Sequence, residues 1–143
     1  MKKYQGSATI IMRFALASGF LSAVASRLGL WGSHSSGWTS FLIYTKSVNS
    51  FAPASLVPVL AVMSTMLETT FAILLLIGYK TKWAALGASV LTLLFALSMA
   101  YSFGLKEPLD YSVFAFSASA FLLSTLPDFP FSIDQQIKKF QVN

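Results

Sequence analysis

The sequence contains no cysteine and a single histidine, His34, and only 10% of its 143 residues are charged. Without cysteine there is no disulfide, CxxC redox motif, iron–sulfur cluster or thiolate metal site. One histidine also argues against a zinc or haem site built by the protein, so we expect no metal. Soluble domains carry about 25% charged residues, so most of this chain is not expected to face water.

The formal net charge is +5. The basic residues stand singly or in pairs outside the apolar runs, with no long basic stripe and no nucleic-acid-binding motif. We therefore expect membrane lipids, and not nucleic acid, as partners of these lysines and arginines.

Glu68 is the only charged residue in the apolar run between Leu56 and Gly78. A run of this length can cross a bilayer, which takes about 20 residues. A carboxylate at that depth costs a few kcal/mol even on lenient insertion scales, roughly 3 kcal/mol. Glu68 is therefore predicted to face the protein interior, beside a partner, a proton or a ligand.

Four long apolar runs predict an all-α fold, a membrane-embedded bundle of four transmembrane helices forming a single domain over residues 1–143. The predicted helices cover about residues 8–30, 54–78, 83–103 and 109–126, followed by a polar tail over 127–143. A long loop separates the first two helices, and Trp38 to Val48 within it is predicted to form a short helix at the membrane interface. The tail is predicted to end in a small amphipathic helix.

The N-terminus resembles a secretory signal, with Lys2, Lys3, an apolar stretch and small residues around Val24. Arg13 interrupts its apolar core, so we predict a retained first helix. With four crossings, both termini and the turn at residues 79–82 share one side of the membrane. That side holds most of the basic residues: Lys2, Lys3, Lys80, Lys82, Lys138 and Lys139. The positive-inside rule then predicts cytoplasmic termini and an outward-facing 31–53 loop.

Arg13 is the predicted partner of Glu68, because both lie on the cytoplasmic side of the bundle, at about 8 Å and 15 Å depth by helical rise. Three interpretations remain open. The pair could fix helix register, it could line a cavity for a polar headgroup, or Glu68 could be protonated and hydrogen-bonded to a neighbouring helix.

A second polar cluster is expected on the outer side, where Asp110 falls in the predicted first turn of the fourth helix and suits its dipole. The alternative is an ion pair between Asp110 and Arg27, with the phenol of Tyr111 at the mouth of an outward pocket. The candidate ligand-binding residues are Arg13, Glu68, Arg27, Asp110 and Tyr111. The sequence has no Ser-His-Asp set, P-loop or GxGxxG motif, so catalysis within this chain is not expected.

Two stretches of the chain resemble the DoxX family of membrane proteins, namely RFALASGFL from Arg13 and ETTFAILLLIGYKTK from Glu68. The segments FLSAVASRLGLWG from Phe20 and KEPLDYS from Lys106 are similar to a bacterial DoxX-like subgroup. The resemblance covers roughly residues 10–126. The chain departs from the family at three positions, with Ala17 and Ala72 where glycine is frequent and Lys82 where arginine is frequent.

The resemblance implies a four-helix bundle in the bacterial inner membrane and an association with redox complexes, since the family is named for a subunit of a thiosulfate:quinone oxidoreductase. It implies a quinone- or lipid-binding accessory subunit, with a protein partner of the redox complex carrying out the chemistry. Two other functions stay open: a small-molecule or proton transporter that titrates Glu68, and a structural or assembly subunit without a ligand. A homo-oligomer is a further expectation for a transporter, because four short helices enclose little volume.

Overall fold

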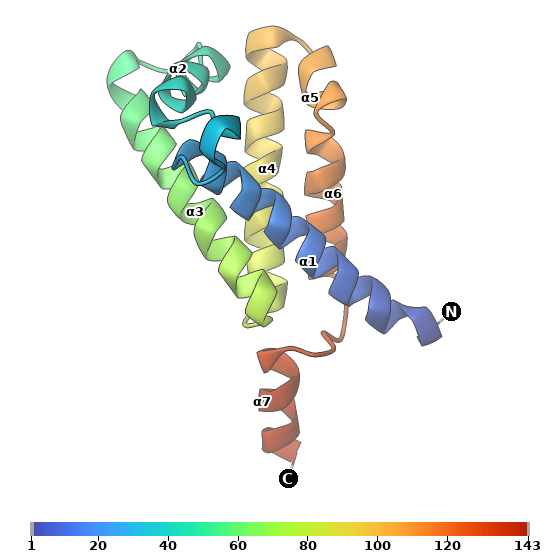
Figure 1. Cartoon of the computed structure of the whole chain (residues 1–143). Coiled ribbons are helices and arrows are strands. Elements are labelled where there is room, and N and C mark those ends of the chain that lie inside the picture. The colour runs from blue at the N-terminus through green and yellow to red at the C-terminus, as the bar shows by residue number, and fades with distance from the viewer. Residues whose placement is uncertain (1, 143) are drawn as a thin grey trace.

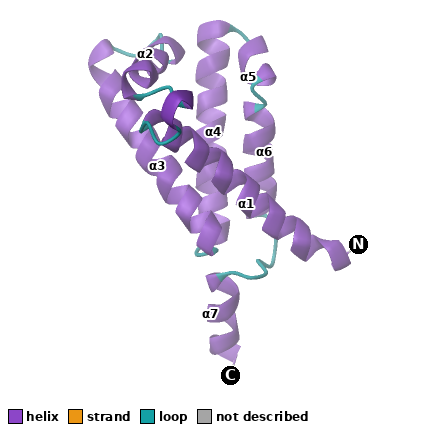
Figure 2. Ribbon diagram, viewed as in Figure 1, coloured by secondary structure: helices purple, strands orange, loops and turns teal. Residues whose placement is uncertain are grey.

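The computed structural model describes the backbone of residues 2–142 and the side chains of residues 4–140. All regular elements in this part of the chain are helical (Figure 2). The elements in chain order are α1 (Lys2–Arg27), η1 (Gly32–His34), α2 (Trp38–Val48), η2 (Ala54–Leu56), α3 (Val57–Ile77), α4 (Thr81–Phe103), α5 (Lys106–Asp110), α6 (Val113–Ser124) and α7 (Ile133–Val142). The predicted all-helical class is confirmed for the described residues.

Three segments are long and apolar enough to cross a membrane: Tyr4–Arg27, Ala54–Ile77 and Thr81–Phe103. They correspond to α1, to η2 with α3, and to α4. Helix α6 is also apolar, but it has 12 residues. At 1.5 Å per residue its length is about 18 Å, which is less than the roughly 30 Å of a bilayer core. Three helices therefore have the length and composition of membrane-crossing helices, as in a membrane protein.

The predicted helix over residues 109–126 is divided in the structure. Leu109 belongs to α5, and Ser112 adopts a left-handed backbone conformation with φ 55° between α5 and α6. A right-handed helix cannot continue through such a residue, because each of its residues needs a φ of about −60°. No glycine stands at this break, so the sequence carried no local signal for it.

The long helices pack as antiparallel neighbours. Helix α1 lies against α3, α3 against α4, and α4 against α6, while α1 crosses the others obliquely and also contacts α6 (Figure 1). Most residues of the buried core are alanines. The core consists of Leu16, Ala17, Phe20, Ala72, Leu75, Ala84, Ala85, Ala88, Ala120 and Leu123. Small residues let helices approach closely in lipid. Ala17 and Ala72, which replace frequent family glycines, are fully buried and serve this purpose.

The connection between α1 and α3 is not an open loop. It contains α2 over Trp38–Val48, so the predicted short helix is confirmed, and α2 packs against α3 and α4. Helix α7 lies beyond the opposite end of the bundle (Figure 1). It carries Ile133, Ile137 and Phe140 at spacings of four and three residues, which confirms the predicted amphipathic helix in the tail.

Candidate functional site

Glu68 is buried in the middle of α3 and forms an ion pair with Arg27 at the end of α1. Arg27 Nη2 donates a hydrogen bond of 3.1 Å to Glu68 Oε1, and Nη1 lies 2.8 Å from Oε2. The side chains are 12% and 2% exposed, respectively. The contact between Nη1 and Oε2 lacks hydrogen-bond geometry, so Oε2 is held by charge attraction and accepts no hydrogen bond within the described residues.

The Arg27 guanidinium has two further neighbours. Its Nη1 donates a hydrogen bond of 3.3 Å to Thr65 Oγ1, one turn before Glu68 on α3. Its Cζ lies 3.9 Å from the centre of the Phe41 ring in α2, which is a cation–π contact. Arg27 therefore joins α1, α2 and α3 at one point.

The predicted Arg13–Glu68 pair is wrong. Arg13 is fully buried, and its Nε and Nη2 donate hydrogen bonds of 2.9 and 3.0 Å to the carbonyl oxygens of Leu75 and Leu76. The last carbonyls of a helix have no partner within the helix, and a guanidinium satisfies them. Insertion depth alone does not determine the partner of Glu68, because α1 crosses α3 so that Arg27, at the other end of α1, reaches Glu68.

The same guanidinium also holds the chain after α6. Arg13 Nη1 donates hydrogen bonds of 2.9 and 3.3 Å to the carbonyl oxygens of Pro130 and Phe131. Gly78, which ends α3 with φ 68°, leaves the space that this arrangement requires. A Cβ atom on Gly78 would lie 2.4 Å from Arg13 Nη2 and 2.3 Å from Ser132 Cβ. The close approach therefore requires glycine at position 78.

Asp134, in the first turn of α7, completes this end of the bundle. Its Oδ1 and Oδ2 accept hydrogen bonds of 2.8 Å from the backbone N–H groups of Lys80 and Thr81. Its own N–H donates to the Gly78 carbonyl oxygen at 2.9 Å. A carboxylate here satisfies N–H groups at the start of α4 that lack helical partners. Arg13 and Asp134 together fasten the tail to the turn between α3 and α4.

The predicted outer cluster does not form. Asp110 is the last residue of α5, so it does not lie in the first turn of a long helix as expected, and its carboxylate pairs with Lys106 instead of Arg27. Both side chains of that pair are largely exposed, and Tyr111 is 68% exposed. The five candidate residues therefore occupy three separate places, and only Arg27 and Glu68 meet.

Tyr44 of α2 lies close to α5 at this outer end. Burial raises the pKa of the Tyr44 phenol, and the nearby Tyr111 and Glu107 raise it further. The Tyr44 phenol is therefore neutral at physiological pH. It does not supply a charge to the outer surface.

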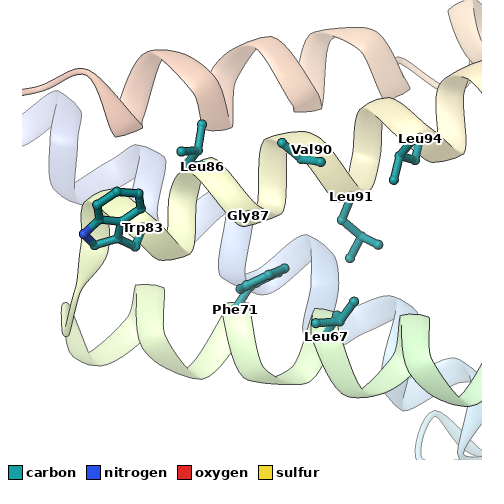
Figure 3. Close-up of a pocket in the computed structure, with 8 residues that line it drawn as sticks. All are labelled: Leu67, Phe71, Trp83, Leu86, Gly87, Val90, Leu91 and Leu94. Atoms are coloured by element: carbon teal, nitrogen blue, oxygen red, sulfur yellow. The ribbon is translucent and has the colours of Figure 1, made fainter.

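An apolar groove runs along the outside of the bundle between α3 and α4 (Figure 3). Its volume is about 430 Å³, and its lining residues are Leu67, Phe71, Trp83, Leu86, Gly87, Val90, Leu91 and Leu94. The ring of Phe71 lies on Gly87, where a Cβ atom would approach the ring to 2.5 Å. Neither Arg27 nor Glu68 lines this groove, so the groove does not correspond to the predicted polar pocket.

A second apolar groove, of about 510 Å³, lies between α1 and α6. It is lined by Ala8, Ile11, Met12, Ala15, Leu16, Phe116 and Ser119. No group of three or more metal-ligating side chains is present in the part of the chain that the structure describes. Both grooves are apolar and lie apart from the closed Arg27–Glu68 pair.

Several residues of these sites were missed in the sequence. Nothing in the sequence marked Phe41 and Thr65 as neighbours of Arg27, because aromatic and hydroxyl side chains are frequent in membrane helices. Trp83, Gly87 and Leu94 lie at helical spacing along one face of α4, which was a readable signal for a shared surface.

The long apolar helices, with one buried and one largely buried arginine that are both hydrogen-bonded, are typical of an integral membrane protein of the helical type. A model of the DoxX family matches residues 8–101, well over half of the chain. The chain therefore belongs to the DoxX family. The match begins within α1 and ends within α4. No curated protein and no solved structure matches the chain significantly.

Proposed function

We propose that this DoxX-family protein crosses the bacterial inner membrane four times, with both termini in the cytoplasm. Three of the helical segments are long and apolar enough for such a crossing. For the fourth, α5 and α6 follow one another beside α4 and return the chain towards the end where α7 lies (Figure 1). Lys80, Lys82, Lys138 and Lys139 gather at that end, and the positive-inside rule favours placing it in the cytoplasm.

We further propose that the protein is an accessory subunit of a redox system and that it binds a ligand with a long apolar chain, a quinone or a lipid. The groove between α3 and α4 carries this proposal, because it is apolar throughout and opens to the side where lipid would lie. Phe71 and Trp83 add flat aromatic surface to it (Figure 3). The redox association comes from the family resemblance, and a chain without cysteine would leave thiol chemistry to its partner.

Retention of a ligand by the purified protein tests this function. Protein extracted in mild detergent should keep a quinone or a lipid in native mass spectrometry. Glu68→Gln should keep that ligand too, because the groove does not include Glu68. Absence of any retained quinone or lipid from the wild-type protein would contradict the proposal.

A structural or assembly subunit is the second candidate, and the closed Arg27–Glu68 pair favours it. A side chain that is 2% exposed and paired to an arginine has no free surface for a headgroup. In this case, deleting the protein should deplete a partner complex from the membrane, and groove variants should restore that complex fully. Failure of the groove variants to restore it would favour the ligand-binding function.

A transporter that titrates Glu68 is the third candidate. Protons would have to reach a carboxylate whose two oxygens both face Arg27. Proteoliposomes containing the wild-type protein and Glu68→Gln separate this function from the others, because a transporter would lose proton-coupled flux in the variant. Equal flux in both would exclude Glu68 as a proton carrier.

A further inference from the structure

We propose that the groove between α3 and α4 holds one acyl chain of an anionic phospholipid, with the phosphate at Lys80 and Lys82. This inference rests on the proposed ligand-binding function and names the ligand class. Its three supports are the length of the groove, the shape of its floor and the charge at one end.

The groove has the length of one acyl chain. On α4 it extends from Trp83 to Leu94, eleven residues apart in sequence. At 1.5 Å per residue this distance is about 16 Å. Half of a bilayer core is about 15 Å thick, so the groove accommodates a chain from a single leaflet. The lining side chains are all apolar, which matches a hydrocarbon tail.

The floor of the groove depends on Gly87, which has no side chain. Gly87 presents bare backbone between α3 and α4, and the Phe71 ring lies directly on it. A methyl group at position 87 would meet ring atoms at 2.5 and 2.7 Å, so the ring would have to move. Leu67 and Leu91 continue the floor from the two helices (Figure 3).

The charge lies at the Trp83 end of the groove. Lys82 directly precedes Trp83 and stands one helical turn before Leu86, and Lys80 is in the adjoining turn. Both lysine side chains are exposed, and neither forms an ion pair within residues 4–140. The nearby Asp134 carboxylate is already bound by the backbone N–H groups of Lys80 and Thr81. Trp83 is 66% exposed, as expected for tryptophan at a membrane interface.

This charge distinguishes the two ligands of the proposed function. A quinone headgroup is neutral and gains little from two ammonium groups. A phospholipid headgroup with a net negative charge gains roughly a factor of five in affinity from each lysine near the membrane surface, whereas the choline of a zwitterionic headgroup offsets this gain. The lysines therefore favour an anionic phospholipid over a quinone or a neutral lipid.

The test uses the full chain in nanodiscs that contain phosphatidylglycerol and phosphatidylcholine in equal amounts with identical acyl chains, followed by release for native mass spectrometry. The wild-type protein should retain one phospholipid, with phosphatidylglycerol preferred at least about fivefold. Lys80→Gln with Lys82→Gln should keep the phospholipid and lose the preference. Lys138→Gln with Lys139→Gln makes the same change of charge on α7 and should keep the preference.

A second pair of variants tests the groove itself. Val90→Phe fills the groove with a ring and should abolish retention of both phospholipids. Val62→Phe places the same ring on an exposed position of α3 outside the groove and should leave retention unchanged. Equal thermal stability of the two variants in detergent shows that folding is not the cause.

Three outcomes would overturn the inference: equal retention of the two lipids by the wild-type protein, loss of the preference in the α7 variant, or retention unaffected by Val90→Phe. A quinone added to the nanodiscs and retained in place of phospholipid would overturn the inference and still support the proposed function. Retention of neither quinone nor lipid would contradict both.

Discussion

The two arginines of α1 are satisfied in different ways. Arg13 is fully buried and binds only carbonyl oxygens, two from the end of α3 and two from the chain after α6. Arg27 is 12% exposed and binds a carboxylate, a hydroxyl and an aromatic ring. A guanidinium can therefore be stabilised near a membrane by helix-end carbonyls as well as by a counter-ion. The presence of one acidic residue in a neighbouring helix therefore does not show which arginine it pairs with.

Removal of Arg13 should have the largest effect on stability. Arg13→Met leaves four carbonyl oxygens without their donor and releases the tail from α3. We expect a loss of about 4 kcal/mol or more, because hydrogen bonds to charged groups contribute about 1.5–3 kcal/mol each. Thermal unfolding in detergent measures it. Arg13→Lys should recover only part of the loss, since an ammonium group lacks the planar fork, and full recovery by lysine would contradict this account.

Breaking the Arg27–Glu68 pair from one side should have the next largest effect. Arg27→Met leaves a buried carboxylate without its counter-ion, which costs about 3–5 kcal/mol. The double variant Arg27→Met with Glu68→Met should regain most of that stability, because no charge then remains buried. A double-mutant cycle from thermal unfolding tests the coupling. Additive losses would show that the two residues do not act as a pair.

The Asp134 cap should matter less than either arginine. Asp134→Ala removes the acceptor of two backbone N–H groups at the start of α4. We expect a loss of about 1 kcal/mol, as for other helix caps. Hydrogen exchange should accelerate at residues 80–82 and stay unchanged around Arg27. Asp134→Asn should retain part of the protection, and uniform acceleration along the chain would contradict a local role.

The Lys106–Asp110 pair should contribute least. Both side chains are largely exposed, and exposed ion pairs contribute about 0–1 kcal/mol. Asp110→Asn should therefore change thermal stability by no more than the scatter between replicate unfolding curves. A loss comparable to that of Asp134→Ala would mean that this end of the bundle is covered by another group in the membrane.

Much of the fold was predictable from sequence because the apolar runs have the length of a bilayer crossing. The short helix at Trp38–Val48 and the amphipathic α7 were also predicted, since both show local patterns of apolar residues. The break at Ser112 was not predictable, because a left-handed serine carries no compositional signal. The partner of Glu68 was predicted wrongly for a different reason. The depth of a residue along its own helix gives no information on the angle at which the neighbouring helix crosses.

By itself, the sequence determined that this is a helical membrane protein of the DoxX family, that Glu68 is buried, and that no thiol chemistry occurs within the chain. The helical membrane class and the burial of Glu68 follow from the apolar runs, and the exclusion of thiol chemistry follows from the lack of cysteine. Family membership follows from the match to the DoxX model. Only the tertiary structure decided that Glu68 meets Arg27, that Arg13 binds the end of α3 and the tail, and that Gly87 and Phe71 line an apolar groove between α3 and α4. Those contacts join residues far apart in the chain, so helix crossing angles and side-chain reach determine them.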